Sequence, residues 1–390
     1  MTASASPRIL VVDDNDDNRY TLTLYLDLEG YRDVTIANDG EEAVALLETE
    51  AFDLVLLDVM MPRLDGYGVL AWLKAKGRLH RLPVIMISAL NEMASVVHCI
   101  ELGAVDYLTK PFNPVLLRAR LGASLEKKRL RDEMQGHLAR LERELEAARK
   151  LQMGMLPQSF PPSGAEFPFD IHASIAPALE VGGDLYDVFR AADGSLCFFI
   201  GDVAGKGMPA ALFMARAKSL IRVVTELTAS AGAPADPAAI IRRVNAELCQ
   251  GNDEMMFVTL FFGILSPGGV LLYCNAGHNP PYRIADGKVT PLDGEAGIVL
   301  GVEPGALYRS ARVELMPQDS LFLYTDGVTE AFNASDEPFG EARLEAALAR
   351  AAPSSAAVVE TVAAAVMAFA GAAPRSDDIA MLALRRAEVP

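Results

Sequence analysis

The first 110 residues alternate short apolar runs with segments of helical spacing, and this pattern restricts the possible folds more than any other feature. Five strands are predicted at 8–12, 33–37, 54–57, 83–87 and 105–108. Helices are predicted at 17–28, 41–48 and 69–76, with another reaching Leu102. Alternating strands and helices imply right-handed crossovers. We therefore expect a doubly wound, five-stranded parallel α/β sheet.

Polar residues stand where several of these strands end, which is where such sheets place their sites. Asp13 and Asp14 follow the first strand and Asp58 follows the third. Three neighbouring carboxylates repel one another unless a cation lies among them, and hard oxygens suit Mg²⁺. Ser88 adds a hydroxyl and Lys110 an ammonium group. Taken singly, Asp14 and Ser88 could be helix caps. Together the set predicts transfer of a phosphoryl group onto an aspartate.

Residues 1–127 resemble the receiver domain of two-component response regulators, whose fold is flavodoxin-like. The resemblance implies a histidine kinase as phosphodonor, bound Mg²⁺ and a cis peptide at Lys110-Pro111. The residues that it implies are the phosphoacceptor Asp58, the metal ligands Asp13, Asp14, Asp58 and the Met60 carbonyl, and the switch residues Ser88, Tyr107 and Lys110.

Residues 128–156 are rich in Glu, Lys, Arg and Leu. Their apolar residues recur in alternating steps of four and three, at Met134, Leu138, Leu141, Leu145 and Ala148. This spacing predicts a helical coiled-coil linker and hence a homodimer. The alternative is a single helix packed on its own domain. Gln152 continues the seam as a polar residue, which could set the register or contact the next domain, and Pro157 ends the helix.

A second acidic constellation centres on Gly-Asp-Val-Ala-Gly-Lys-Gly at 201–207. The apolar run 196–200 predicts a buried strand that delivers Asp202 at its end. Asp184, Asp326 and Asp377 also stand beside strand-like runs. Several strand ends can bring such oxygen ligands to one place, where two divalent ions could activate water for attack on phosphorus. This part of the chain has no Cys-rich or Ser-His-Asp signature that would favour a protein nucleophile.

The carboxyl-terminal part has a mixed pattern that favours an α+β sandwich. Helices are predicted at 209–228, 236–249, 341–351 and 356–369. Strands are predicted at 169–174, 196–201, 256–265, 269–275, 312–315, 320–325 and 379–385.

Residues 157–390, together with the preceding helix end at 147–157, resemble the PPM family of metal-dependent serine/threonine phosphatases. The match is to the bacterial branch that regulates sigma factors by partner switching. The resemblance implies an αββα sandwich, two Mn²⁺ or Mg²⁺ ions, and a phosphoserine or phosphothreonine protein as substrate, by analogy an anti-sigma-factor antagonist. The implied metal ligands are Asp184, Asp202, the Val203 carbonyl, Asp326 and Asp377, with Asp187 and Asp378 as supporting residues.

Composition restricts the remaining function classes. The formal net charge of −17 opposes nucleic-acid binding and binding to an anionic membrane surface. The four cysteines are widely scattered, and residues 1–7 lack the apolar region of a signal peptide, so a cytoplasmic protein is expected. Two alternatives stay open. One is a non-catalytic phosphoprotein-binding scaffold controlled by the receiver, and the other is a transcription factor, which the acidic charge opposes.

Overall fold

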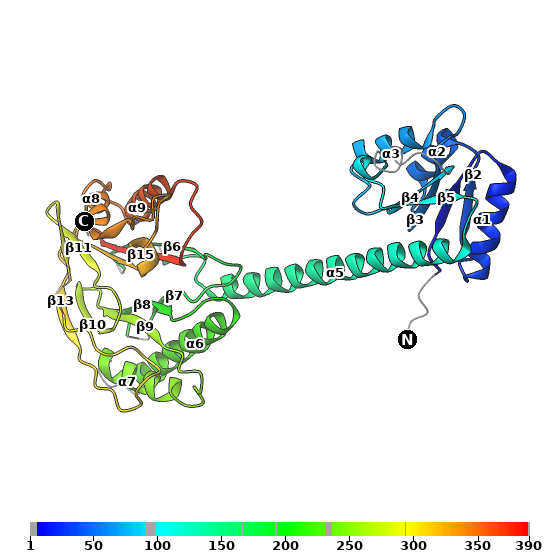
Figure 1. The fold of residues 1–390 in the computed structure, drawn as a ribbon. Coiled ribbons are helices and arrows are strands. Elements are labelled where there is room, and N and C mark those ends of the chain that lie inside the picture. Colours follow the sequence, from blue (N-terminus) through cyan, green and yellow to red (C-terminus); the bar gives the residue numbers. More distant parts are fainter. Residues whose placement is uncertain are drawn as a thin grey trace. The chain divides into compact units, whose positions relative to one another are not determined.

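The computed structural model describes residues 6–388, except 90–98, 162, 165, 166, 192, 231–235 and 293. The chain divides into two compact units, Met1–Leu141 and Glu142–Pro390. Figure 1 shows the helices and strands of both units.

The first unit is built on a five-stranded parallel sheet in the order β2-β1-β3-β4-β5. Its strands are β1 (Ile9–Val12), β2 (Val34–Ala37), β3 (Leu54–Asp58), β4 (Val84–Ala89) and β5 (Asp106–Lys110). Separate apolar clusters cover the two faces, one centred on Leu10, Val55 and Met86, the other on Ile9, Leu54 and Ile85. The predicted doubly wound sheet is confirmed.

Three helices of this unit are α1 (Asp16–Leu28), α2 (Gly40–Thr49) and α3 (Gly66–Ala75). Asn15, not Asp14, caps α1, because its side chain accepts hydrogen bonds from the Asp17 and Asn18 amides. Most of the helix predicted to end at Leu102 lies outside the described residues. The expected cis peptide at Lys110-Pro111 is present.

Helix α5 (Pro114–Met155) is one continuous segment of 42 residues (Figure 1). The last helix of the receiver-like unit and the predicted linker are therefore the same helix. Leu117 and Leu121, near its start, are buried in the core of the first unit. Met153, near its end, packs on a core cluster of the second unit.

The second unit contains two five-stranded sheets, ordered β13-β10-β9-β8-β7 and β12-β11-β14-β15-β6, in which every paired strand is antiparallel. The strands of the first sheet are β7 (Leu185–Arg190), β8 (Leu196–Val203), β9 (Val258–Leu265), β10 (Val270–Ala276) and β13 (Ala311–Glu314). Those of the second are β6 (Phe169–Ala176), β11 (Tyr282–Ala285), β12 (Lys288–Pro291), β14 (Ser320–Tyr324) and β15 (Ile379–Arg386).

Helices cover the outer faces of this pair of sheets. Helices α6 (Met208–Ser230) and α7 (Pro237–Leu248) pack on the first sheet, and α8 (Gly340–Leu348) and α9 (Ser355–Ala370) cover the second (Figure 1). A central apolar cluster joins the inner faces, with Phe198 and Phe261 from one sheet and Leu382 from the other. The expected αββα sandwich is confirmed.

Three strands of the sandwich lie outside the sequence-based expectation, namely β7, β11 and β12. Strand β7 carries the buried Asp187, which interrupts its apolar pattern. Strands β11 and β12 have only four residues each. Asp286 and Gly287 between them both have positive φ, as a two-residue hairpin turn requires. Among the described residues, no helix is long and apolar enough to cross a membrane.

Candidate phosphoacceptor and metal centres

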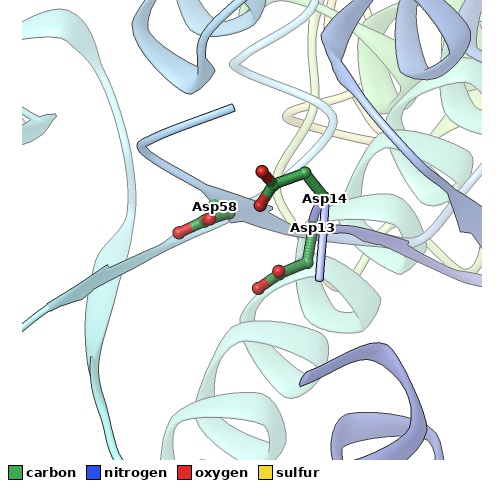
Figure 2. A group of neighbouring side chains, drawn as sticks. All are labelled: Asp13, Asp14 and Asp58. Atoms are coloured by element: carbon green, nitrogen blue, oxygen red, sulfur yellow. The ribbon is translucent and has the colours of Figure 1, made fainter. Parts of the chain in front are cut away.

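Asp13, Asp14 and Asp58 come together at the carboxyl ends of β1 and β3. Figure 2 shows their side chains beside one another, and one carboxylate oxygen from each lies within 4.8 Å of the others. Asp13 and Asp58 are buried, whereas Asp14 is exposed. Two neighbouring parallel strands end here, so the sheet itself assembles the cluster.

Lys110 completes this cluster from the end of β5. Its Nζ lies 2.9 Å from Oδ2 of Asp13 and 2.9 Å from Oδ2 of Asp58. Burial raises the pKa of Asp58 to about 6, and the adjacent Lys110 opposes this rise. Burial disfavours the charged form of Asp58. A Mg²⁺ ion bound among these oxygens would offset this effect, because its charge favours ionised carboxylates.

The structure places the other receiver residues around this centre. Ile87 of β4 pairs with Asp58 of β3, so Ser88 is the next residue along β4 after the partner of Asp58. Tyr107 lies on β5, half-buried, with the Arg120 guanidinium 5.0 Å from its ring centroid. The Met60 side chain is exposed.

In the second unit, strand ends of both sheets bring four further aspartates together. Leu185 pairs with Gly201, so Asp184 and Asp202 stand beside one another where β7 begins and β8 ends. Asp326 follows β14, and Asp377 precedes the neighbouring β15. Thr325 links the sheets, because its hydroxyl donates to Oδ2 of Asp184 at 2.7 Å.

Electrostatics show how closely these carboxylates interact. Burial, followed by the charges of Asp326 and Asp377, raises the pKa of Asp202 to about 7. Burial and the charge of Asp202 raise the pKa of Asp184 well above its ordinary value. The pKa of Asp326 is raised by burial, Glu330 and Asp377. Cations bound at this site would offset the repulsion between the carboxylates, which contributes to these raised pKa values.

Two further observations fit a metal centre. Oδ1 of Asp184 is buried and has no hydrogen-bond partner in the part of the chain that the structure describes. A Cβ on Gly183 would lie 2.7 Å from the Val203 carbonyl oxygen, so only glycine lets these backbones approach. Within the described ranges, only the Asp13 cluster places three carboxylate oxygens within 4.8 Å of one another. The carboxylate oxygens of the second group are spaced more widely than this.

Asp378 supports the loop that carries Asp184. Its carboxylate accepts hydrogen bonds from the Ala178 and Gly183 amides, each at 2.7 Å. Asp187 does not join the carboxylate group: its side chain pairs with Lys218 and lies 3.4 Å from Nη1 of Arg222, both on α6. Asp187 thus ties β7 to that helix.

Gln152, near the end of α5, contacts the same loop. Its amide nitrogen donates to the Gly182 carbonyl at 2.6 Å, and its amide oxygen accepts from the Gly182 nitrogen at 3.2 Å. Gln152 is 8% exposed, so these bonds are shielded from water. Gly182 lies two residues before Asp184, and the helix end is therefore hydrogen-bonded to the edge of the candidate metal centre.

Sequence reasoning missed the role of Thr325. It directly precedes Asp326 in Tyr-Thr-Asp-Gly, but only the fold shows that its hydroxyl reaches Asp184. His278 is buried, with Nδ1 2.9 Å from the Thr259 hydroxyl. Burial lowers its pKa to about 4, against the opposing effect of the Tyr324 carbonyl. The imidazole lies against Thr259, whose hydroxyl is also 3.4 Å from the Asp202 carbonyl oxygen.

Comparison with known proteins identifies both units. Residues 9–122 match the response regulator receiver domain, and residues 192–387 match Stage II sporulation protein E (SpoIIE). The fold and these matches define the class: a receiver domain joined to a PP2C-type phosphatase domain. The chain belongs to the SpoIIE family.

Individual relatives agree with this division. The chain is 31% identical to protein IcfG of Synechocystis sp. over 272 residues, 62% of this chain and 41% of that protein. It is 46% identical over 120 residues to the probable transcriptional regulator ycf27 of Cyanophora paradoxa, covering 31% of this chain and 48% of that protein. The SiaA-PP2C domain of Pseudomonas aeruginosa superposes with a TM-score of 0.55 at 25% identity, covering 64% of this chain and 98% of that domain. The matched part of this chain therefore spans less than half the length of each of these two curated relatives.

Proposed function

We propose that this protein is a response regulator whose output is a metal-dependent protein serine/threonine phosphatase. The observation that carries the proposal is the convergence of Asp184, Asp202, Asp326 and Asp377 from strand ends of two facing sheets. Two Mn²⁺ or Mg²⁺ ions would be held by these carboxylates and the Val203 carbonyl, with Asp202 as the shared ligand. When bound, such ions neutralise a phosphate and supply an activated water.

The chain's own residues would keep this centre in place. Thr325 fixes one oxygen of Asp184 from the opposite sheet, and Asp378 holds the preceding loop through two amide bonds. Such supporting contacts orient metal ligands and usually matter for affinity. Buried His278 contacts Thr259, which lies beside the Asp202 backbone.

Control would begin at the receiver. A histidine kinase would supply the phosphoryl group to Asp58, with Mg²⁺ held by Asp13, Asp14 and the Met60 carbonyl. Lys110 would bind the phosphoryl group, and Ser88 and Tyr107 would respond to it. We further propose that α5 passes the change onward, because the helix that starts in the receiver domain ends in the bonds between Gln152 and Gly182.

The substrate and assembly follow by analogy with the partner-switching phosphatases. The substrate would be a phosphoserine or phosphothreonine protein, most simply an anti-sigma-factor antagonist. The apolar seam of α5 would form a homodimer, since Met134, Leu138 and Leu141 are each more than half exposed in the single chain.

Hydrolysis of p-nitrophenyl phosphate by the full chain tests the catalytic part of this proposal. Activity should require Mn²⁺ or Mg²⁺ and should fall at least about a hundredfold in Asp202→Asn, which keeps the side-chain shape but removes the charge. Asp286→Asn, in the β11–β12 hairpin, is the matched control and should keep full activity. Undiminished turnover in Asp202→Asn would refute the proposal, and phosphopeptide binding without turnover in the unaltered protein would favour the scaffold alternative.

A further inference from the structure

An apolar cavity of about 400 Å³ lies beside Asp377 in the phosphatase domain. Val366 and Met367 of α9 form one wall, and Ile379 and Met381 of β15 contribute another part of the lining. Met367 is 60% exposed, although it belongs to an apolar helix face. The volume falls within the range of ligand pockets, which are mostly apolar with a few polar groups.

The cavity borders the candidate metal centre. Asp377 lines both, and Gly327, the residue after Asp326, also lines the cavity. A substrate whose phosphate reaches Asp377 would therefore have its neighbouring atoms at the cavity. The shared residue Asp377 distinguishes the cavity from an apolar patch elsewhere on the surface.

Polar contacts fix the loop that separates α9 from the metal centre. The Ser376 hydroxyl donates to the Glu330 carbonyl at 2.9 Å, and Nζ of Lys206 lies 3.0 Å from Oδ2 of Asp377. The loop is thus held from two sides, and the cavity is formed before any ligand binds. A preformed site costs less conformational entropy on binding.

Charge at the rim favours a phosphorylated ligand. Arg375 and Asp377 are the charged residues of the lining. Arg375 is exposed, and no carboxylate of the described residues forms an ion pair with it. With Asp377 directed to a metal, the Arg375 guanidinium would be an uncompensated charge of the lining, with Lys206 as a second positive charge nearby. It complements a phosphate dianion or an acidic residue beside it.

We propose that this cavity is a docking subsite for an apolar side chain of the phosphoprotein substrate, located within about three residues of the phosphorylated one. The inference rests on the proposed phosphatase function and adds a sequence preference to it. An extended chain spans about 3.3–3.6 Å per residue, so three residues reach about 10 Å from the phosphate. A site that shares Asp377 with the metal centre lies within that reach.

A set of phosphoserine peptides tests the proposal with the full chain and Mn²⁺. Each peptide carries one leucine at a different position, from three before to three after the phosphoserine, in an alanine–glutamine background. A parent peptide has glutamine instead. At one position, leucine should raise kcat/KM about tenfold over the parent, as expected for burial of a side chain of this size.

Two neighbouring substitutions on α9 test whether the leucine preference arises at the cavity. Met367→Glu places a carboxylate in the cavity lining, whereas Ala368→Glu adds the same charge at an exposed position that does not line it. The ratio of kcat/KM for the preferred leucine peptide to that for the parent should fall to about one in Met367→Glu and stay near ten in Ala368→Glu. Because each ratio is taken within one variant, a general loss of activity does not affect it.

The outcomes separate the two claims. Equal hydrolysis of all peptides by the unaltered protein, or a leucine preference that survives Met367→Glu, would overturn the docking subsite and leave the phosphatase proposal intact. Absence of hydrolysis of both the peptides and p-nitrophenyl phosphate would overturn the phosphatase function and the subsite with it.

Discussion

Gly182 lies close to three residues at or beside the candidate metal centre. Gln152 binds its backbone, Asp184 follows two residues later, and a Cβ on Gly182 would lie 2.1 Å from Oδ2 of Asp378. The Asp378 carboxylate cannot retreat without losing its bonds to the Ala178 and Gly183 amides. The absence of a side chain at Gly182 is therefore a condition for the geometry around Asp184.

This crowding gives a prediction for Gly182→Ala. The added methyl group should displace Asp378 and weaken Mn²⁺ binding by about 10- to 100-fold, as is usual when a residue supporting a metal ligand is disturbed. Calorimetric titration with Mn²⁺ measures the effect. Gly305→Ala is the control, because nothing lies within 4 Å of its added Cβ. Equal affinities in the two variants would contradict the account.

His278 gives a prediction about pH. Its pKa in the folded protein is about 4, below the ordinary 6.5, so the unfolded chain takes up a proton first as the pH falls. Its contribution to stability is complete above pH 6.5 and is lost progressively toward pH 4. Between pH 7 and pH 5 the loss should be about 2 kcal/mol.

Denaturant unfolding followed by circular dichroism, in the unaltered protein and in His278→Asn, isolates this contribution. The difference in unfolding free energy between the two proteins should shrink by about 2 kcal/mol on going from pH 7 to pH 5. A difference that does not change with pH would show that the buried imidazole does not titrate as the structure implies.

At the level of single residues, the sequence was most informative where a short motif carries the chemistry. Asp13, Asp14, Asp58 and Lys110 each end a recognisable apolar strand, and the parallel sheet brings them together. The role of the Thr325 hydroxyl could not be predicted, and although polar Gln152 on the seam could be expected to contact the next domain, its partner Gly182 could not. Each contact joins residues distant in sequence, and their approach depends on the packing of the sheets and of α5.

At the level of elements, α5 is the feature with the clearest consequence. The bonds of its Gln152 side chain satisfy both backbone groups of Gly182 in a buried setting. Gln152→Ala would leave these groups without partners, at a cost of about 1–3 kcal/mol. The loop before Asp184 would then lose its connection to the helix.

We therefore predict that Gln152→Ala removes most of the response of phosphatase activity to receiver phosphorylation. Phosphate release measured with and without acetyl phosphate gives the ratio of the two activities. Gln135→Ala, at an exposed position on the same helix, should keep the ratio of the unaltered protein. A normal ratio in Gln152→Ala would exclude this route of control.

Element prediction succeeded where burial imposes a strong pattern. Strands β1 and β3, inside the parallel sheet, are apolar runs up to their closing aspartates, because both faces are covered. It failed for β11 and β12, which are short and partly exposed, and for β7, whose Asp187 is buried with a lysine of α6. Tertiary pairing supplies the information that the local pattern lacks in these strands.

At the scale of the whole molecule, the four-three spacing of α5 predicts self-association. Leu138 and Leu141 are 53% and 54% exposed in the single chain, which leaves the predicted seam uncovered. The double variant Leu138→Lys/Leu141→Lys should lower the mass measured by light scattering from dimer to monomer, because like charges would face one another across the seam. Arg149→Lys is the control on the same helix. A monomeric unaltered protein would contradict the coiled coil.

The central claim is that the receiver controls a metal-dependent phosphatase, and hydrolysis of a phosphoserine peptide by the full chain in Mn²⁺ tests it most directly. Phosphate release is measured before and after treatment with acetyl phosphate, in the unaltered protein and in Asp58→Asn. The account predicts metal-dependent release that increases several-fold on treatment of the unaltered protein and does not change in Asp58→Asn. Metal-independent release, or an equal increase in both proteins, would contradict it.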